Sequence, residues 1–516
     1  MQERFFPIGI QTFEKIREQN AIYVDKTDLI YRLAKGGNYY FLSRPRRFGK
    51  SLLVSTIKSY FEGRKDLFEG LAIAELEKDW VKYPVLRFDL SRKKVASVED
   101  VGYLLDDNLR SLEEIYGRGG AAESQYGLRM SDLIVRAKAQ TGQNVVLLFD
   151  EYDAPLLDTM HDKSLFMAVR HQLRDFFSPI KASDDKLRFV FITGISKFSQ
   201  LSIFSELNNL TMITMEKEYA SICGFTKEEL QEQLKPEIQN MAQALGIQES
   251  TVLARLKRKY DGYHFTKNSP DIYNPLSLLK CLREKEFNHY WFSTGTPTHL
   301  IEMLSKYTLS PEQLEGFTAT VSMFDVAFEL AESPIPILYQ SGYLTIKSCK
   351  GVRYTLGFPN EEVRLGFLQG LMPYYTKKIR DDNEIFLSDL TLAFEEHRVD
   401  DAMQLLRSFY SSIPYDAEIQ DENHFKTIFY LIFRLAAAFE VRTEERSAAG
   451  RCDALIETED TIYLFEFKLD GTAEEALKQI DDKGYAIQYE AGDKKIVKIG
   501  ANFESDRRTI ERWIVG

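Results

Sequence analysis

The sequence predicts a multidomain α/β protein: a doubly wound parallel sheet, a mainly helical, winged-helix-like middle, and a second α/β domain at the C-terminal end. Two observations lead to this prediction. Short apolar runs alternate with helical patterns over roughly residues 1–220, as in parallel sheets with crossover helices. A strand, strand, strand, helix, strand pattern then follows between residues 439 and 503.

Length and composition restrict the class of protein. Because 516 residues exceed what one hydrophobic core supports, we expect domains at 1–225, 226–385 and 386–516. The 66 Lys+Arg and 78 Asp+Glu residues give a net charge of −12, which argues against a general nucleic-acid or membrane binder. Four scattered cysteines and no apolar run of about 18 residues indicate a cytoplasmic protein without membrane association.

The first domain is expected to contain four buried strands, at residues 39–43, 85–88, 145–149 and 189–193. An i, i+4, i+7, i+8 spacing predicts a helix directly after the first strand, with an apolar face of Leu53, Ile57, Tyr60 and Phe61.

Residues 44–51, RPRRFGKS, join that strand to that helix. A phosphate-binding loop needs backbone N–H groups at a helix N-terminus, a lysine for the terminal phosphates and a hydroxyl for magnesium. Arg44 stands where the usual pattern has its first glycine. The expected nucleotide-binding residues are Arg46, Arg47, Phe48, Gly49, Lys50, Ser51 and Leu52. Alternatively, the side chains of Arg46 and Arg47 pair structurally with Asp25 or Asp153.

The run at 145–149 ends in two carboxylates. We expect Asp150 to hold Mg²⁺ together with Ser51, and Glu151 to orient or deprotonate the attacking water. The alternative is a buried strand with a merely acidic end. The run at 189–193 makes Thr193, and Ser196 beyond it, candidate sensors of the γ-phosphate.

A helical stretch downstream carries Arg170 and Arg174. These arginines either reach a neighbouring subunit in a homo-oligomer or lie on a solvated helix face.

Three motifs, YVDKT at 23–27, SRPRRFGKS at 43–51 and FDEYD at 149–153, resemble the bacterial AAA-ATPase-like proteins, whose phosphate loop has RPRRF in place of the glycine-rich stretch. YDGY at 260–263, YNP at 273–275 and FPNEEV at 358–363 also look like family signatures. The resemblance covers nearly the whole chain. It implies that the nucleotide is ATP and that Arg44 is a family variant.

In the last domain, Asp453 precedes the triplet Glu466, Phe467 and Lys468. Cleavage of phosphodiesters with a metal needs carboxylates for Mg²⁺ and a lysine beside the water. Period-two alternation puts Glu466 and Lys468 on one face of a strand and turns Phe467 into the core. The apolar flanks count against the alternative, a surface strand with alternating charges.

This pattern is similar to the PD-(D/E)xK superfamily, which has a restriction-endonuclease-like fold. The resemblance implies supporting roles for Gln479 and Tyr485 on the next helix. Glu422 is the expected third acid, with His424 as the alternative.

The middle of the chain gives weaker signals. Runs at 338–347 and 352–358 are expected to pair as a wing, and residues 387–415 are expected to form a helical connector. The basic cluster of Arg255, Lys257, Arg258 and Lys259 either contacts phosphates or lies on a solvated helix face.

The sequence therefore predicts an ATP-binding ATPase (EC 3.6-type) whose nucleotide state gates a Mg²⁺-dependent DNA endonuclease-like domain. Defence against foreign DNA and the handling of mobile elements are contexts by analogy only. The alternative is a regulatory signalling ATPase whose inactive nuclease-like tail binds a protein partner. In a third reading, ATP is a structural ligand without turnover.

Overall fold

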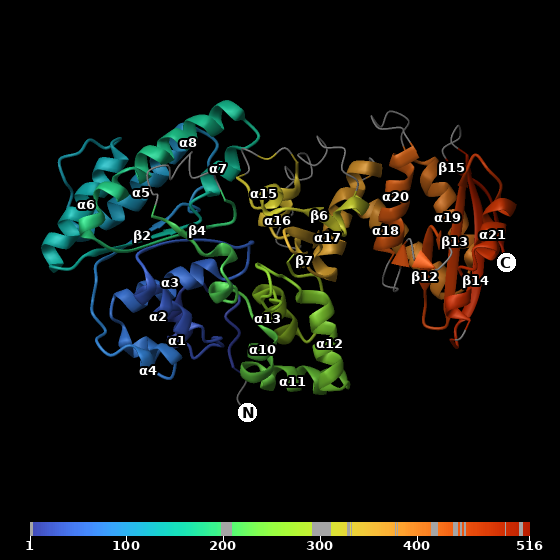
Figure 1. The fold of residues 1–516 in the computed structure, drawn as a ribbon, viewed down its shortest axis with the longest axis horizontal. Helices are drawn as coiled ribbons and strands as arrows, with labels where there is room; N and C mark the ends of the chain where they lie inside the picture. The colour runs from blue at the N-terminus through green and yellow to red at the C-terminus, as the bar shows by residue number, and fades with distance from the viewer. Residues whose placement is uncertain are drawn as a thin grey trace. The chain divides into compact units, whose positions relative to one another are not determined.

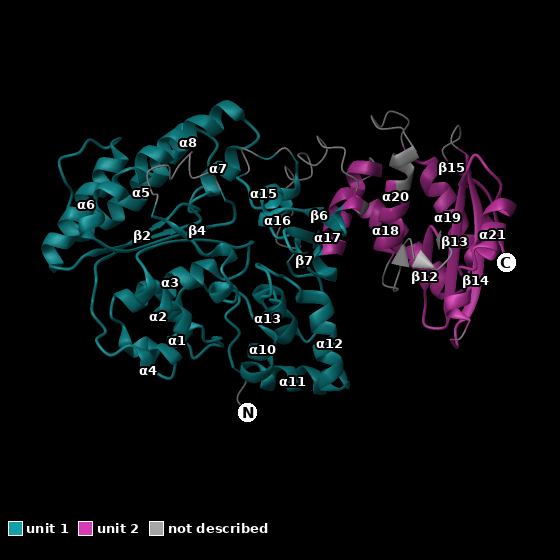
Figure 2. Cartoon of the chain, in the orientation of Figure 1, with its two compact units in different colours: residues 1–295, 314–363 teal, residues 296–313, 364–516 magenta. Residues whose placement is uncertain are grey.

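A computed structural model of the chain divides into two compact units, shown in Figure 2: residues 1–295 with 314–363, and residues 296–313 with 364–516. The residues that it describes are 4–197, 209–291, 311–327, 331, 333–376, 378, 380–413, 422–436, 442–443, 446–447, 450–490, 492–504 and 509–516. Each unit is built around its own sheet.

The sheet of unit 1 has five parallel strands in the order β2-β3-β4-β1-β5. Their bounds are β1 Tyr39–Ser43, β2 Val85–Asp89, β3 Val145–Asp150, β4 Leu187–Gly194 and β5 Thr211–Met212. This confirms the predicted doubly wound parallel sheet. The order places β4 between β1 and β3, so the loops that follow these three strands share one edge of the sheet.

Helices cover both faces of this sheet. In Figure 1, α5, α6 and α8 lie on one side of it, and α1, α2 and α3 lie on the other. The bounds are α1 Phe13–Glu18, α2 Thr27–Gly36, α3 Lys50–Phe61, α4 Ala72–Leu76, α5 Val98–Tyr116, α6 Tyr126–Thr141, α7 Ala154–Thr159, α8 Lys163–Phe177 and α9 Pro179–Ala182. The helix predicted to follow β1 is therefore α3.

A helical segment of unit 1 follows the sheet. It comprises α10 Lys227–Gln233, α11 Lys235–Leu245, α12 Glu249–Tyr260 and α13 Pro275–Glu284. Thr226 and Glu229 form a capping box that begins α10. The segment has a core of its own, which Ile22 and Val24 from the N-terminal part of the chain join.

The winged region is a three-stranded antiparallel sheet in the order β6-β8-β7. Its elements are β6 Phe317–Ala319, α15 Val321–Phe324, α16 Ile335–Gln340, β7 Thr345–Lys350 and β8 Arg353–Gly357. The prediction of a strand from residue 338 is wrong, because 338–340 belong to α16. Pro334 and Pro336 favour a helix start, since proline fits the first turn of a helix.

Helix α17, Glu361–Thr376, begins in unit 1 and continues into unit 2 from Arg364. The predicted connector at 387–415 is two helices, α18 Arg380–Glu395 and α19 Val399–Ser411. His397 lies between them and has a left-handed φ of 58°. Residues 414 and 415 lie outside the described part of the chain.

The sheet of unit 2 has the order β15-β14-β13-β12-β9, with β13 and β14 parallel and the other pairs antiparallel. Its elements are β9 Arg442–Thr443, β12 Ala454–Glu457, β13 Thr461–Leu469, β14 Lys495–Glu504, β15 Thr509–Val515, α20 Glu422–Leu435 and α21 Ala473–Asp482. Strands β10 Arg446–Ser447 and β11 Gly450–Arg451 pair separately. Of the strand predicted at 439–442, only residue 442 is described. Strand β15 was not predicted.

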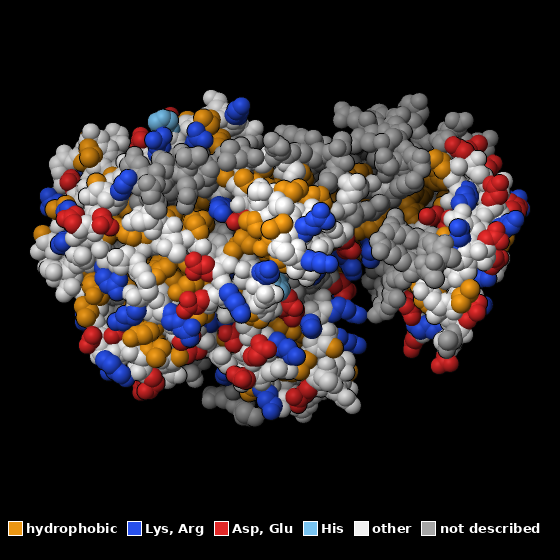
Figure 3. Space-filling view, in the orientation of Figure 1, with side chains coloured by type: hydrophobic (Ala, Val, Ile, Leu, Met, Phe, Trp, Pro, Cys, Tyr) orange, Lys and Arg blue, Asp and Glu red, His pale blue; other side chains and the backbone are white. Residues whose placement is uncertain are grey.

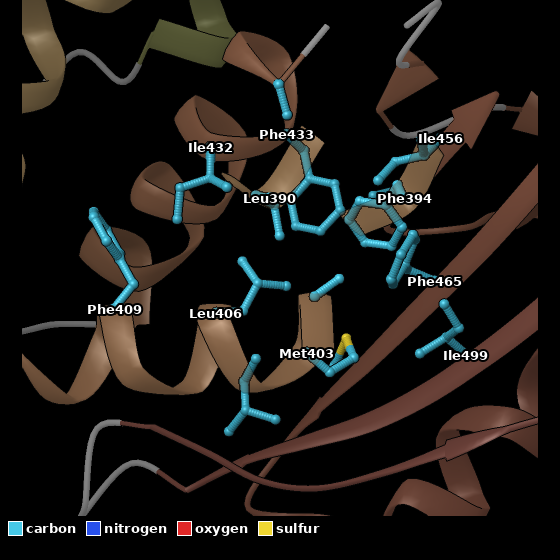
Figure 4. Packing of buried hydrophobic residues seen from close by; sticks show 14 of the residues in the cluster. Leu390, Phe394, Met403, Leu406, Phe409, Ile432, Phe433, Ile456, Phe465 and Ile499 are labelled. Atoms are coloured by element: carbon cyan, nitrogen blue, oxygen red, sulfur yellow. The ribbon is translucent and has the colours of Figure 1, made fainter. Parts of the chain in front are cut away.

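The core of unit 2 lies between this sheet and helices α18, α19 and α20. Figure 4 shows Leu390, Met403, Phe433 and Phe465 pointing toward one another from three helices and a strand. A smaller apolar cluster, which includes Leu464 and Ile480, packs α21 on the other face. Alternate side chains of β13 therefore face α18–α20 or α21.

The surface carries charges of both signs. In the space-filling view of Figure 3, basic and acidic side chains are interspersed over the visible face of each unit. Among the helices that the structure describes, none combines the length and apolar character needed to cross a bilayer.

Candidate functional sites

The loops after β1, β3 and β4 are tied together at the carboxyl edge of the sheet. The amide of Arg44 donates to the carbonyl of Gly194 at 3.2 Å, and the amide of Tyr152 donates to the carbonyl of Thr193 at 3.1 Å. Glu151 itself has a left-handed φ of 47°, a strained geometry for a side-chain-bearing residue that often occurs at functional sites.

Lys50 and Glu151, predicted from separate motifs, meet at this edge. The Lys50 Nζ lies 3.2 Å from Glu151 Oε1 and donates to the carbonyls of Arg44 at 3.1 Å and Pro45 at 3.3 Å. The lysine side chain is buried, whereas that of Glu151 is 22% exposed. The ammonium group therefore bridges the phosphate loop and the acidic strand end.

Asp150 is the buried acid of the site. Ser51 lies close enough to its side chain to lower its pKa, and Arg87 Nη2 lies 3.2 Å from its Oδ2. Its Oδ1 is buried without a hydrogen-bond partner among the described groups. Burial, and then the charge of Glu151, raises the pKa of Asp150 to about 6. An unpartnered carboxylate oxygen beside a hydroxyl fits a magnesium ion, which prefers oxygen ligands.

In the loop between Arg44 and Lys50, some residues are exposed to solvent and others are buried. Arg46, Arg47 and Gly49 are exposed, and Gly49 begins α3 with a φ of 90° and no side-chain cap. The backbone N–H groups of the first turn of α3, which includes Leu52, are thus available to a ligand or to solvent. Phe48 is buried, so its contribution to a nucleotide site would come from its backbone.

Arg44 has a structural role that the sequence did not predict. Its buried guanidinium donates to the carbonyls of Thr214 at 2.9 Å and Tyr219 at 3.1 Å, and it lies over the Phe265 ring at 4.1 Å. Burial lowers the pKa of Arg44 to about 10. Arginine at this glycine position therefore anchors the start of the loop to the segment after β5.

The predicted γ-phosphate sensors are engaged within the protein. Thr193 Oγ1 donates to the carbonyl of Leu42 at 2.8 Å, and Ser196 Oγ hydrogen-bonds to Asp153 Oδ2. Among the contacts that the structure describes, none joins Arg46 or Arg47 to Asp25 or Asp153. Asp153 accepts from Ser196, and Asp25 accepts from Thr27 and from the amide of Ala72.

Two helical predictions involve basic residues. On α8, Arg174 is exposed and Arg170 is half-buried. In the cluster at 255–259, three residues have intramolecular partners: Arg258 pairs with Glu361 at 2.9 Å, and Lys259 and Arg255 contact Phe287. Arg255, Lys257 and Arg258 are exposed, as on a solvated helix face, and contact of the cluster with phosphates stays a prediction.

Residues of the middle region, among them Tyr263 of the motif at 260–263, contact the phosphate loop. Phe48 packs edge-on against Tyr263 and Phe265, with ring centroids 4.7 and 5.4 Å apart. A Cβ at Gly342 would lie 2.6 Å from Pro45 Cβ. Trp291 Nε1 donates to the carbonyl of Arg46 at 3.4 Å. The motifs at 260–263 and 358–363 meet where Asn360 Nδ2 donates to the Asp261 carbonyl at 2.9 Å.

Replacing Gly262 with alanine is expected to destabilise unit 1. Gly262 has a φ of 91°, and a Cβ there would lie 2.2 Å from the carbonyl oxygen of Pro359. The left-handed backbone alone costs about 1–2 kcal/mol, and the clash adds to it. Gly246→Ala is the matched control, since its φ is 66° and its Cβ would meet nothing within 4 Å. Urea unfolding should show a clearly larger loss for Gly262→Ala; equal losses would contradict the close approach.

In unit 2, the predicted nuclease residues gather on the α21 side of β13. Lys468 Nζ lies 3.4 Å from Glu466 Oε1 and donates to Gln479 Oε1, and Gln479 Nε2 donates to Glu466. Gln479 also lies close enough to the buried Tyr485 hydroxyl to lower its pKa, although burial raises that pKa overall. Phe467 faces the other way, with its ring 4.3 Å from that of Phe429 on α20.

Asp453 lies beside this group. Its Oδ2 accepts from the amide of Phe467 at 2.8 Å. The Glu466 side chain is 4% exposed, and its Oε2 has no hydrogen-bond partner among the described groups. Burial, and then the charge of Asp453, raises the pKa of Glu466 to about 7. An acid in this environment is stabilised by a bound cation, so the unpartnered oxygen fits a metal ligand.

The third acid stays a prediction. Glu422 is the first residue of α20, but its side chain and that of His424 lie outside the described part of the structure. Within the described part, no group of three or more His, Cys, Asp or Glu side chains is arranged to hold a metal. Asp453 and Glu466 are therefore the two described acids of this site.

Sequence reasoning missed one residue of the first site, Arg87. It lies in β2, whose other central residues are apolar and buried. The available signal was this charged residue inside an apolar run, since a charge buried in a sheet needs a partner.

Comparisons with known proteins match two separate parts of the chain. A family model described as "Predicted AAA-ATPase" (AAA-ATPase_like) matches residues 7–204, and one for the PD-(D/E)XK nuclease superfamily matches residues 420–513. An Azotobacter chroococcum mcd 1 protein, described as "Uncharacterized protein in vnfD 5'region", is 34% identical over 535 aligned positions, covering 100% of this chain and 99% of its own.

Among solved structures, "Structure of the Aeropyrum Pernix ORC2 protein (ADPNP-ADP complexes)" is similar over 67% of this chain and 92% of its own, with 12% identity and a TM-score of only 0.23. The full-length match and the two family models together identify the chain. It belongs to the AAA-ATPase-like family and carries a PD-(D/E)XK nuclease superfamily domain at its C-terminal end.

Proposed function

We propose that unit 1 binds ATP with Mg²⁺ and hydrolyses the ATP. The observation that carries this proposal is the meeting of Lys50 with Glu151 and of Ser51 with Asp150 at one edge of the sheet. Lys50 would bind the terminal phosphates, Ser51 and Asp150 would hold the metal, and Glu151 would orient the attacking water. Magnesium neutralises the charge that develops on the phosphates.

For the C-terminal domain, we propose Mg²⁺-dependent cleavage of DNA. Asp453 and Glu466 would hold the metal, and Lys468 would position water and stabilise negative charge on the phosphate. Gln479 supports this role because it hydrogen-bonds to both Lys468 and Glu466. Glu422 is proposed as a further ligand. The arrangement of acid and lysine, rather than the overall charge, carries this proposal.

Supercoiled plasmid DNA is the direct test of the second activity. The full chain is incubated with the plasmid, with and without Mg²⁺ and with and without ATP. We expect nicking that requires Mg²⁺ and whose rate changes when ATP is added. Absence of nicking with Mg²⁺ and with Mn²⁺ would instead favour the regulatory ATPase, which the net charge of −12 also suits.

Control of one activity by the other is proposed to run through Trp291 and α17. Trp291 Nε1 contacts the carbonyl of Arg46 on the phosphate loop, while the amide of Trp291 donates to Glu362 Oε1 at 2.7 Å. Glu362 lies in the first turn of α17, the helix that continues into unit 2. A movement of the loop on nucleotide binding would thus displace the start of that helix.

Replacing Trp291 with phenylalanine is expected to separate the two activities. The ring can still pack against Tyr343, whose centroid lies 5.1 Å away, but the donor to Arg46 is lost. Phosphate release should be retained, whereas the effect of ATP on nicking should disappear. Trp80→Phe is the control, because Trp80 Nε1 has no hydrogen-bond partner among the described groups. Unchanged ATP control in Trp291→Phe would contradict this route.

A further inference from the structure

Arg87 lies beside the acidic end of β3. In the parallel register of β2 and β3, Arg87 pairs with Leu148 and Asp89 pairs with Asp150. Alternate residues of a strand share a face, so Arg87 and Asp150 lie on the same face of the sheet. Arg87 Nη2 lies 3.2 Å from Asp150 Oδ2, and the two side chains are 27% and 2% exposed.

The position of Arg87 inside the sheet is unfavourable for an arginine side chain. A guanidinium loses hydration when it enters a sheet, and the Nε of Arg87 is buried without a hydrogen-bond partner among the described groups. The nearby Asp89 does not explain the arginine, since its Oδ1 accepts from the amide and the hydroxyl of Ser91, at 3.0 and 2.7 Å. The described charge partner of Arg87 is therefore Asp150.

The contact with Arg87 gives the two carboxylate oxygens of Asp150 different surroundings. Oδ2 faces Arg87, whereas Oδ1 is buried and has no hydrogen-bond partner among the described groups. A guanidinium that holds one oxygen restricts rotation of the carboxylate and leaves the other oxygen available. Groups that orient a metal ligand in this way typically contribute 10–100-fold to metal affinity.

We infer that Arg87 is a positioning residue of the nucleotide site, which holds the Asp150 carboxylate so that Oδ1 can bind the divalent cation that accompanies the nucleotide. This inference rests on the proposed ATP-binding function. A purely structural role, joining β2 to β3, would affect stability without affecting the cation.

The test compares full-length Arg87→Gln and Arg87→Lys with the parent protein. Three quantities are measured: Mn²⁺ binding in the presence of ADP, the Mg²⁺ concentration that half-saturates phosphate release, and the unfolding temperature. Arg87→Gln should weaken Mn²⁺ binding and raise the half-saturating Mg²⁺ by about 10-fold or more. At saturating Mg²⁺, the KM for ATP should change little. Arg87→Lys should recover part of the affinity, because lysine keeps the charge but not the planar fork.

Arg188→Gln is the matched control. Arg188 lies in β4 of the same sheet, but its Nη2 donates to the carbonyl of Ala34 at 2.6 Å. Its loss should leave the Mg²⁺ requirement unchanged. If Arg87→Gln lowers only the unfolding temperature, or tightens Mn²⁺ binding, the inference is overturned while the proposed function stands. If the parent protein binds neither ADP nor ATP, both are overturned.

Discussion

Replacing Glu151 with glutamine is expected to lower phosphate release by about 10²–10⁴-fold, the usual contribution of a general base. Glutamine has the same shape but cannot take a proton from water, and it removes the charge that pairs with Lys50 at 3.2 Å. ATP binding should persist, because the phosphate loop, Ser51 and Asp150 are unchanged. The measurements are phosphate release and binding of a fluorescent ATP analogue.

The control for this change is Glu62→Gln. Glu62 is also paired with a lysine, since Lys58 Nζ lies 2.9 Å from its Oε2, but the pair is a surface i, i+4 pair at the end of α3. Such a pair contributes about 0.3–0.5 kcal/mol and should not affect turnover. Phosphate release at the parent rate in Glu151→Gln would remove Glu151 from the mechanism. If the parent protein binds ATP but releases no phosphate, ATP is a structural ligand.

Replacing Lys468 with alanine is expected to reduce plasmid nicking by at least about 10²-fold, as for the loss of one group that stabilises transition-state charge. Lys468 contacts both Glu466 and Gln479, so its loss removes the cation of the site and leaves Glu466 buried beside Asp453. ATP hydrolysis in unit 1 should be unaffected. Nicking and phosphate release are measured on the same preparation.

Lys498→Ala provides a close comparison. Lys498 lies on β14, next to β13, and its Nζ pairs with Asp481 Oδ1 of α21 at 2.6 Å. The same substitution on the same sheet thus breaks a contact with the same helix at a different place. It should nick DNA at the parent rate. If Lys468→Ala cuts as well as the parent protein, the assignment of the nuclease site fails.

Much of each site was predictable because its geometry is local. An apolar run that ends in Asp150 and Glu151 places both carboxylates at a strand end, whatever the rest of the fold. Period-two alternation likewise fixes Glu466 and Lys468 on one face of β13 and turns Phe467 to the other. These features depend only on residues that are neighbours in the sequence, so the residue pattern is sufficient to predict them.

Two secondary-structure errors had a different cause. Strand β15 contains Glu511 and Arg512 in its middle, so its pattern is not that of a buried strand, and only its pairing with β14 makes it one. The run at 338–347 is apolar enough for a strand, but its first part forms α16. In both segments tertiary context overrides the local preference.

By itself, the sequence determined which residue types lie at the ends of which strands, and hence the two groups that we assign to nucleotide and to metal. Only the tertiary structure decided their partners: Arg87 beside Asp150, Arg44 against the carbonyls of Thr214 and Tyr219, and Phe48 under Tyr263. The physical reason is that these contacts join segments far apart in the chain. A buried guanidinium or ring must find a partner, but local sequence does not specify which partner the fold brings to it.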